Sequence, residues 1–316
     1  MSNLKTKASK IFLACALAGT AYSATAAEKP LKSIGITVGS LGNPYYVAIA
    51  KGAEARAKAI NPNVSITTVS ADYDLNKQFT QIDNLIAAHV DMILLVASDA
   101  KAIEPAVRKA QAAGIIVVAV DVAAAGANAT VQTNNVKAGE IACDYIAKKL
   151  NGKGNVIIEN AEQVSAVVDR VNGCKSVLVK YPAIKVLSSD QNAHGSRDGG
   201  MNTMQGYLTR FPKIDGLFAV NDPEAIGSDL AAKQLHRTGI VIASVDGAPD
   251  IESALKSDTS IHASASQDPY AMAQKAVEVG NEIRNGKKPS NDMILLEPTL
   301  ITRENVGTYK GWNAAR

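Results

Sequence analysis

The chain has 316 residues, of which 47% are hydrophobic and only 4% aromatic. Its 33 Lys and Arg residues exceed its 30 Asp and Glu residues by three, and the first 27 residues hold three lysines and no acid. The rest of the chain is therefore electrically balanced, which gives no evidence for nucleic-acid binding.

Residues 1–27 have the pattern of a secretory signal peptide. A lysine-containing head precedes an apolar stretch, and small residues around Ala26 offer a cleavage site. Cys15 lies in an imperfect lipoprotein box, so we favour simple cleavage, with the mature protein beginning at Ala27 or Glu28. No later apolar run reaches the ~18 residues of a membrane helix, so we expect a soluble mature protein.

After the leader, short apolar runs alternate with helical patterns. Runs begin near Ser33, Val64, Asp91 and Ile115, and helices are predicted from Pro44, Asn76 and Lys101. After a predicted helix over residues 136–150 the series repeats, with runs near Asn155, Ile184, Ile214 and Ile240 and helices from Ser165, Arg197 and Pro223. The offset of about 120 residues predicts two similar α/β halves, each with a parallel sheet.

The end of the chain adds strands to both halves. A run over residues 261–266 is followed by a predicted helix over residues 269–284 and by runs around Ile294 and Leu300. Each half would gain a strand, so the chain is expected to cross between the halves three times. Such a hinge places a cleft between the carboxyl ends of the two sheets, where ligands bind in open α/β folds.

Polar side chains follow the predicted strands in both halves. Asn43, before Pro44 at a predicted helix start, is followed by two tyrosines. The full set is Asn43, Tyr45, Tyr46, Ser98, Asp121, His194 to Arg197, Asn221 and Asp246, with Arg170 near a helix start and Gln267 near a crossover. Carboxylates, amides, a guanidinium and two rings suit a small polyhydroxylated ligand. The alternatives are helix capping for each Asp, Asn or Ser, and a surface ion pair for Arg170.

Beyond its leader, the chain resembles the periplasmic sugar-binding proteins of ATP-driven (ABC) importers, in the ribose-binding branch. The resemblance rests on Leu41-Gly-Asn-Pro-Tyr-Tyr, Val118-Ala-Val-Asp121, Asn134-Asn-Val-Lys-Ala-Gly-Glu-Ile-Ala, Ala219-Val-Asn-Asp222 and Val245-Asp-Gly-Ala-Pro-Asp250. It implies the type I periplasmic binding protein fold: two doubly wound parallel-sheet domains joined by a three-crossover hinge near 133–134, 267 and 298. The expected lobes are residues 28–133 with 268–297, and residues 134–267 with 298–316.

The resemblance also implies the site and the partners. In that branch the positions of Asn43, Tyr45, Tyr46, Asp121, Arg170, Asn221, Asp246 and Gln267 contact the sugar. A monomeric protein in the periplasm would bind the sugar without a cofactor or a metal and deliver it to a membrane permease. Three positions depart from ribose binders, which carry an arginine at Val122, an asparagine near Val96 and an aromatic near Gly195. We favour a pentose-sized monosaccharide, with a hexose or a sugar alcohol as alternatives.

Motifs for other chemistry are poor. No dinucleotide, phosphate-loop or zinc-protease motif occurs, and the residues from Asp72 to Asn76 resemble a calcium loop but are better interpreted as a helix start. A secreted enzyme acting on sugars remains the alternative class, because Asp121 and Asp246 could meet across the cleft. We interpret the chain as a binding protein rather than an enzyme.

Two cysteines, Cys143 and Cys174, remain after the leader. Both fall on predicted helices that would pack near the same strand of the second half. An oxidising compartment favours a disulfide between them. Two buried free thiols are the alternative.

Overall fold

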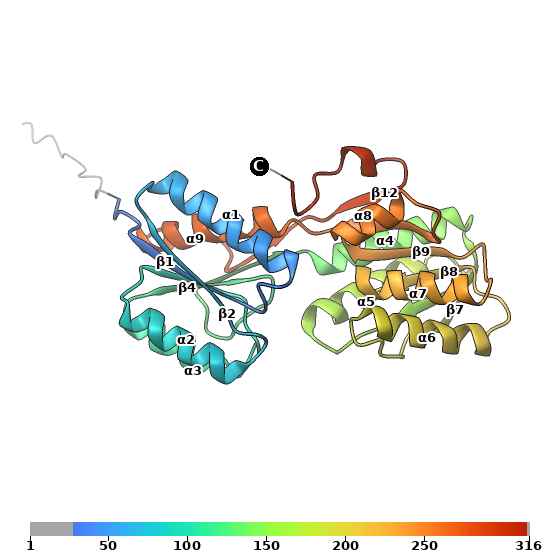
Figure 1. Cartoon of the computed structure of the whole chain (residues 1–316), viewed down its shortest axis with the longest axis horizontal. Helices are drawn as coiled ribbons and strands as arrows, with labels where there is room; N and C mark the ends of the chain where they lie inside the picture. The colour runs from blue at the N-terminus through green and yellow to red at the C-terminus, as the bar shows by residue number, and fades with distance from the viewer. Residues whose placement is uncertain (1–27, 315–316) are drawn as a thin grey trace, which may run out of the picture.

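The computed structural model describes residues 28–314, so the predicted leader lies outside the described residues. The chain forms two α/β lobes side by side (Figure 1). The elements of the first lobe are β1 (Ser33–Val38), α1 (Pro44–Ile60), β2 (Ser65–Ser70), α2 (Leu75–Ala87), β3 (Met92–Leu95), α3 (Glu104–Ala112), β4 (Ile116–Val120), β5 (Ala129–Thr133), α9 (Pro269–Arg284) and β11 (Met293–Leu296).

The second lobe repeats this plan. Its elements are α4 (Asn135–Lys149), β6 (Lys153–Glu159), α5 (Ser165–Leu178), β7 (Ala183–Ser188), α6 (Arg197–Arg210), β8 (Gly216–Ala219), α7 (Asp222–Gln234), β9 (Val241–Asp246), α8 (Pro249–Leu255), β10 (Ile261–Ser266), β12 (Thr299–Thr302) and the short 3₁₀ helix η1 (Val306–Thr308).

The two sheets have equivalent strand orders, β11-β5-β4-β3-β1-β2 and β12-β10-β9-β8-β6-β7. All neighbouring strands pair in parallel except β12, which is antiparallel to β10. The predicted duplication of a parallel α/β unit is confirmed. Three elements, β5, α8 and η1, were not predicted. The strand β5 has two threonines and a glutamine among its five residues and so is not an apolar run, while α8 and η1 are too short to show a helical period.

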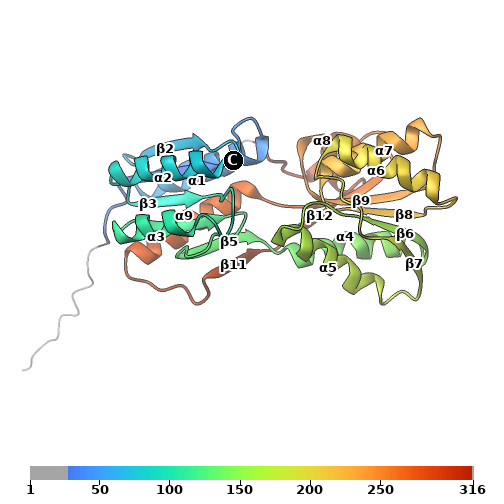
Figure 2. The same cartoon turned by 90° about the horizontal axis from the view of Figure 1, so that it is seen from below.

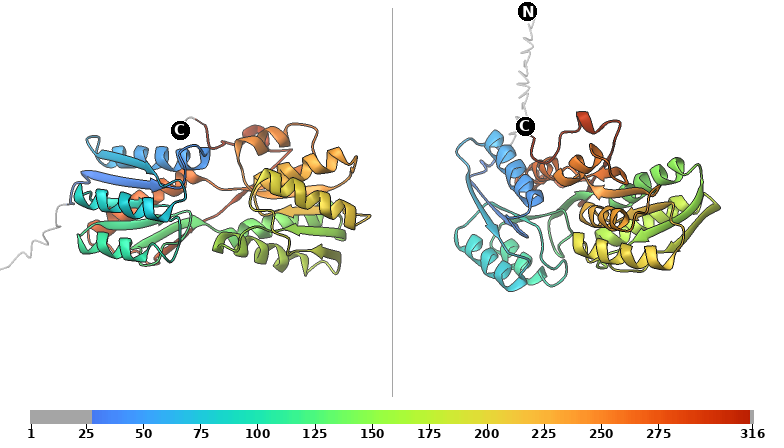
Figure 3. Two further views of the ribbon diagram at one scale, coloured as in Figure 1. Left: turned by 60° about the horizontal axis from the view of Figure 1, so that its bottom comes forward. Right: turned by 45° about the vertical axis from the view of Figure 1, so that its right-hand side comes forward.

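The chain changes sheet at three places: from β5 to α4, from β10 to α9, and from β11 to β12. Figures 2 and 3 show the two lobes with the connecting segments passing between them. The predicted three-crossover hinge is confirmed, and the changes fall close to residues 133, 267 and 298. Because all three lie together, the carboxyl ends of both sheets face one another across the hinge.

Each sheet is covered on both faces. In the first lobe, α1 and α9 pack against one face through a core that contains Ile36, Ile49 and Ala276. The other face packs against α2 and α3 through Ile82 and Val107. In the second lobe α4 and α5 cover one face, and α6, α7 and α8 cover the other. Both lobes are therefore doubly wound, as predicted.

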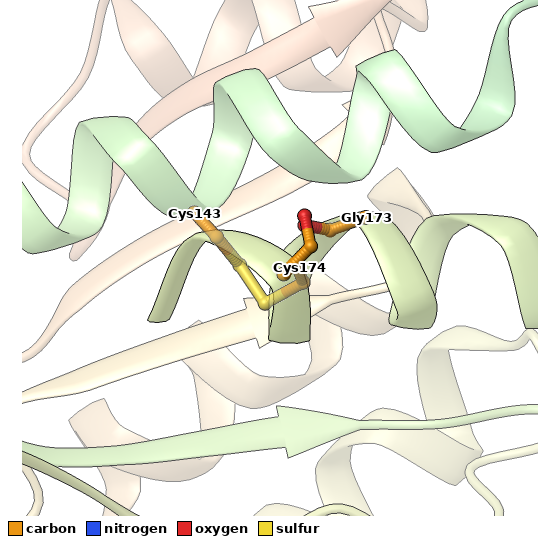
Figure 4. The surroundings of a disulfide bond; sticks show 4 residues. Cys143, Gly173 and Cys174 are labelled. Atoms are coloured by element: carbon orange, nitrogen blue, oxygen red, sulfur yellow. A yellow bond between two sulfur atoms is a disulfide. The ribbon is translucent and has the colours of Figure 1, made fainter. Parts of the chain in front are cut away.

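A disulfide joins Cys143 of α4 to Cys174 of α5, with a Cα–Cα distance of 5.1 Å (Figure 4). The two helices approach closely because glycines face each other's backbone. A Cβ atom at Gly139 would lie 1.9 Å from the carbonyl oxygen of Arg170, and one at Gly173 would lie 2.0 Å from that of Val136. Of the two alternatives for this cysteine pair, the structure contains the disulfide.

Two further searches cover residues 28–314. No helix in this part of the chain combines the length and the apolar character needed to cross a membrane. The same residues contain no cluster of three or more His, Cys, Asp or Glu side chains that could hold a metal ion.

Candidate functional site

A cavity of about 680 Å³ lies between the lobes, at the carboxyl ends of strands from both sheets. All eight residues that the resemblance implies as sugar contacts line this cavity, including Gln267 of the hinge. The lining residues used below are Asn43, Tyr45, Tyr46, Asp121, Val122, Arg170, Arg197, Asn221, Asp222, Asp246, Asp250, Gln267 and Trp312. The predicted residues from both halves are thus brought together.

The wall from the first lobe is aromatic. Asn43 caps α1 by accepting a hydrogen bond from the amide of Tyr45, and the helix start then directs Tyr45 and Tyr46 toward the cavity. The two rings meet edge to face with centroids 5.6 Å apart. Helix capping and cavity lining are therefore not alternatives for Asn43, because one residue does both.

Asp121 follows β4 and is held by Tyr45, whose hydroxyl donates to Asp121 Oδ1 at 2.6 Å. Burial raises the pKa of Asp121 to about 6, although the hydrogen bond from Tyr45 and the charge of Arg170 oppose this shift. The backbone of Asp121 has φ = 72°, a left-handed conformation that side chains rarely adopt. Such strain gathers at binding sites, where it fixes the direction of a side chain.

The wall from the second lobe is charged. Arg170 Nη1 lies 3.2 Å from Asp246 Oδ1, and the guanidinium also donates to Asn135 Oδ1 and to the carbonyl of Val220. Asp246 likewise has a positive φ, of 135°. Burial raises the pKa of the Asp246 carboxyl, and the positive charge of Arg170 opposes this rise. Arg170 is buried, so the surface ion-pair interpretation is wrong for this residue.

Gln267 connects the two walls through the hinge. Its amide nitrogen donates to Asp246 Oδ1 at 2.8 Å, and its amide oxygen accepts from Thr133 Oγ1 at 2.8 Å. The hydroxyl of Tyr45 lies 3.3 Å from the same oxygen. A continuous polar chain therefore runs from Asp121 through Tyr45 and Gln267 to Asp246.

Asn221 caps α7 by accepting from the amide of Glu224, and its side-chain amide donates to the carbonyl of Gly195. Its neighbour Asp222, which was not predicted, is completely buried. Asp222 accepts hydrogen bonds from Ser244, Ser264 and the amide of Ala248.

Burial together with the charge of Asp246 raises the pKa of Asp222 to about 8. A signal for Asp222 did exist: Ser244 interrupts the apolar run of β9, and Ser264 lies between two alanines of β10. The sequence shows these two serines, but it does not indicate that both donate hydrogen bonds to Asp222.

Two further lining features were missed or only partly predicted. Arg197, named within the predicted stretch from His194, pairs with Asp250 across α6 and α8, with Nη2 2.7 Å from Oδ2. Trp312, from the C-terminal segment, also lines the cavity. It belongs to no predicted element, so no sequence pattern marked it.

Ser98 does not line the cavity, and neither do His194, Gly195 and Ser196 of the predicted stretch before Arg197. The amide of Ser98 donates to Gln78 Oε1, and its buried hydroxyl has no partner in the structure. Gln78 belongs to α2 and also donates to the carbonyl of Val96, so this end of β3 is bound to the helix instead of the cavity. We remove Ser98 from the proposed site.

The positions that depart from ribose binders differ in their surroundings. Val122 lines the cavity and places an apolar side chain beside Asp121. Val96 is buried, and Gly195 takes φ = 59° while its carbonyl accepts from Asn221. Of these three positions, only Val122 lines the cavity, so only the replacement of arginine by valine changes the cavity surface directly.

The calcium-like stretch forms a helix start, as interpreted from the sequence. Asp74 is the N-cap of α2 and accepts from the amides of Asn76 and Lys77. Asp72 instead forms an ion pair with Lys77 on the surface.

Comparison with known proteins adds independent evidence. The model of the periplasmic binding protein domain matches residues 34–288. The xylitol-binding protein of Mycolicibacterium smegmatis is 34% identical over 89% of this chain and 80% of its own length. The ribose import binding protein of Bacillus subtilis is also 34% identical, over 81% of this chain and 83% of its own length.

Among solved structures, one similar chain is an ABC transporter periplasmic solute-binding protein from Actinobacillus succinogenes with bound D-allose. It is 26% identical, has a TM-score of 0.80, and the match covers 88% of this chain and 100% of that one.

Proposed function

The chain belongs to the periplasmic binding protein domain family, and from this premise we propose that it captures a monosaccharide or a sugar alcohol in the cavity between its lobes. It then delivers this ligand to the membrane permease of an ABC importer. The relatives named for sugars and for a sugar alcohol support this function. In this proposal the protein acts in the periplasm as a monomer, after removal of its leader.

The observation that carries the proposal is the polar chain between the two walls. Asp121 comes from one lobe and the Arg170–Asp246 pair from the other, with Gln267 of the hinge between them. Sugar hydroxyls donate to carboxylates and accept from a guanidinium, so one ligand could use both walls at once. The rings of Tyr45 and Tyr46 offer an apolar surface to the CH face of the ligand.

Two contacts on opposite lobes imply closure on binding. A ligand that touches both walls only in the closed form must favour that form over the open one. Hinge closure around a ligand is a common response in two-lobed binding proteins. We therefore expect the hinge at residues 133, 267 and 298 to absorb the motion.

The size of the ligand is the open part of the proposal. The two curated relatives are named for five-carbon compounds, while the solved structure holds a six-carbon sugar. Val122 adds an apolar side chain where ribose binders carry a cation, which favours a ligand with fewer acceptors at that point. A pentose-sized ligand remains our first choice, and six-carbon sugars enter the same test.

A thermal-shift screen with D-ribose, xylitol, D-allose and myo-inositol tests the function. A compound at ~100 times its Kd should add about 2.7 kcal/mol to the free energy of unfolding. Small-angle scattering with that compound should show a smaller radius of gyration. A chromatographic search for product, run on the same mixtures, separates binding from turnover. The proposal is wrong if no compound shifts the melting temperature, or if the protein converts the compound that does.

A further inference from the structure

The last described residues of the chain cross between the lobes a fourth time. We call residues 309–314 the C-terminal strap. After η1 in the second lobe, the hydroxyl of Tyr309 donates to the carbonyl of Gly247, 3.0 Å away. Gly247 directly follows Asp246, so the strap begins beside the charged wall of the cavity. Figure 1 shows the last described part of the chain, drawn in red, between the two lobes, in agreement with this path.

The strap then passes tightly over α8. A Cβ atom at Gly311 would lie 1.8 Å from Glu252 Oε1, so only a glycine permits this approach without a shift of the glutamate. Beyond Gly311, the indole nitrogen of Trp312 donates to the carbonyl of Gln267, 3.2 Å away. The strap is thus bound to the second lobe at Tyr309 and to the hinge at Trp312.

The ring of Trp312 packs with the first lobe. Its centroid lies 5.0 Å from that of Tyr45, at an interplanar angle of 73°, and the residue belongs to the same core cluster as β1 and α1. Trp312 is only 8% exposed, yet it lines the cavity. A side chain that is mostly packed and still borders the cavity is held in place before any ligand arrives.

We propose that Trp312 is a ligand-contacting residue that determines affinity and specificity, positioned by the C-terminal strap. This inference rests on the proposed function. Tyr45 contacts the rings of both Tyr46 and Trp312, and these three rings line the same cavity as the Arg170–Asp246 pair. Two of these rings come from α1 and the third comes from the other end of the chain. A ligand would place its CH face on these rings and its hydroxyls toward the charged wall.

The strap also links ligand binding to the hinge. Trp312 is hydrogen-bonded to the backbone of Gln267, whose side chain bonds to Asp246. A ligand that contacts the indole ring therefore contacts a residue that is hydrogen-bonded to a crossover between the lobes. We expect Trp312 and Gln267 to move together when the lobes close.

Three variants test the proposal. Trp312→Ala removes the ring, Trp312→Phe keeps an aromatic ring without the indole N–H, and Tyr181→Ala removes a ring that packs in the second lobe away from the cavity. Affinity is measured by calorimetry, at a temperature where every variant is folded, for whichever of D-ribose, xylitol, D-allose and myo-inositol binds the wild type. We expect about tenfold weaker binding for Trp312→Ala, less than about threefold for Trp312→Phe, and no change for Tyr181→Ala.

Fluorescence supplies a second readout, at the indole ring itself. Trp312 is the one tryptophan of the sequence, so emission of the wild type reports this ring alone. We expect the binding compound to change the emission wavelength and to lower quenching by acrylamide. Emission that ignores a saturating compound, or unchanged affinity in Trp312→Ala, would overturn the inference and leave the proposed function standing. A wild type that binds none of the compounds would overturn both.

Discussion

Arg170 Nη1 and Asp246 Oδ1 lie 3.2 Å apart in an ion pair whose side chains are only 8% and 16% exposed. Each partner has further hydrogen bonds, Arg170 to Asn135 and Val220 and Asp246 to Gln267. A buried pair of this kind depends on both members, since removal of one leaves an uncompensated charge.

The first prediction follows from this dependence. Arg170→Ala or Asp246→Ala should lower the free energy of unfolding by roughly 3–5 kcal/mol, because the remaining charge stays buried. Arg170→Ala combined with Asp246→Ala should cost less than the sum of the single changes. Urea unfolding of the four proteins measures this coupling. Strict additivity would show that the two side chains do not interact in solution.

The same single variants should weaken ligand binding. Hydrogen bonds to charged groups contribute about 1.5–3 kcal/mol, which corresponds to about tenfold to a few hundredfold in Kd. Calorimetry on the variants that retain cooperative melting checks this. Wild-type affinity in both would place the ligand elsewhere.

A second prediction concerns pH and Asp121, whose pKa is raised by burial to about 6. A ligand hydroxyl that donates to the carboxylate favours its ionised form and so lowers the pKa in the complex. Affinity should therefore be full only well above pH 6 and should fall as the pH drops through and below 6. Asp121→Asn should bind more weakly at pH 7.5 and lose this pH dependence. A wild-type affinity that is constant from pH 5 to 7.5 would contradict the role given to Asp121.

A third prediction concerns two buried acids behind the cavity, Glu159 and Glu224. Glu159 Oε2 accepts from Ser228, while Glu159 Oε1 and Glu224 Oε2 have no partner. Burial raises the pKa of Glu159 well above its usual range, and burial raises that of Glu224 to about 8. Both groups therefore hold protons in the folded state that the unfolded chain releases.

The sign of the effect follows from this difference. Between about pH 5 and pH 8 the folded protein binds more protons than the unfolded chain, so stability falls as the pH rises. Glu159→Gln should be more stable than the wild type at pH 8 and should depend less on pH. Glu54→Gln, at an exposed ion pair with Lys58, is the control and should leave the slope unchanged. Chemical unfolding across this pH range provides the measurement, and equal slopes for Glu159→Gln and wild type would refute the assignment.

A fourth prediction concerns the disulfide between Cys143 and Cys174, which are 31 positions apart in sequence. Closing a loop of this length should stabilise the fold by ~3–4 kcal/mol. The double substitution of both cysteines by serine should lower the urea midpoint accordingly, with ligand affinity unchanged because the bond lies away from the cavity. A loss of affinity in the folded double variant would show that the bond also shapes the site.

The fifth prediction separates two neighbouring acids. Asp74→Ala removes the N-cap of α2 and should cost about 1 kcal/mol of stability. Asp72→Ala removes only an exposed ion pair with Lys77 and should cost much less. Neither change should alter ligand affinity. Equal losses in thermal unfolding would show that the cap does not stabilise the helix.

Much of the fold could be predicted because parallel sheets need continuous apolar strands, and runs such as residues 116–120 are evident in the sequence. The start of α3 was less accurate. It begins at Glu104 instead of Lys101, because Asp99 first accepts from two backbone amides in a turn. Local hydrogen bonds of this kind compete with the helix and leave no periodic signal.

The sequence predicts the site residues that directly follow a strand. It does not predict those whose position depends on contacts between segments far apart in the chain. Asp121 and Asp246 stand directly after apolar runs, so their place at the sheet edge could be inferred. Ser98 has the same position in sequence, but Gln78 of α2 binds its amide and the serine lies outside the cavity. Asp222 depends on serines from two other strands, and Trp312 on a return of the chain to the first lobe. Neither relationship has a local pattern.

The helix α9 is far in sequence from the rest of its lobe, which has a consequence for the order in which the two lobes are synthesised. Met272, Ala273 and Val277 of α9 belong to the core of the first lobe, yet the helices and strands of the second lobe other than β12 and η1 are synthesised before them. A nascent chain that ends at β5 lacks the edge strand β11 and one of the covering helices, α9. At 5–20 residues per second, the 151 residues from 134 to 284 take roughly 8–30 s to add. For that interval the first lobe is an incomplete domain that lacks α9 and β11, and the apolar face that α9 covers is exposed.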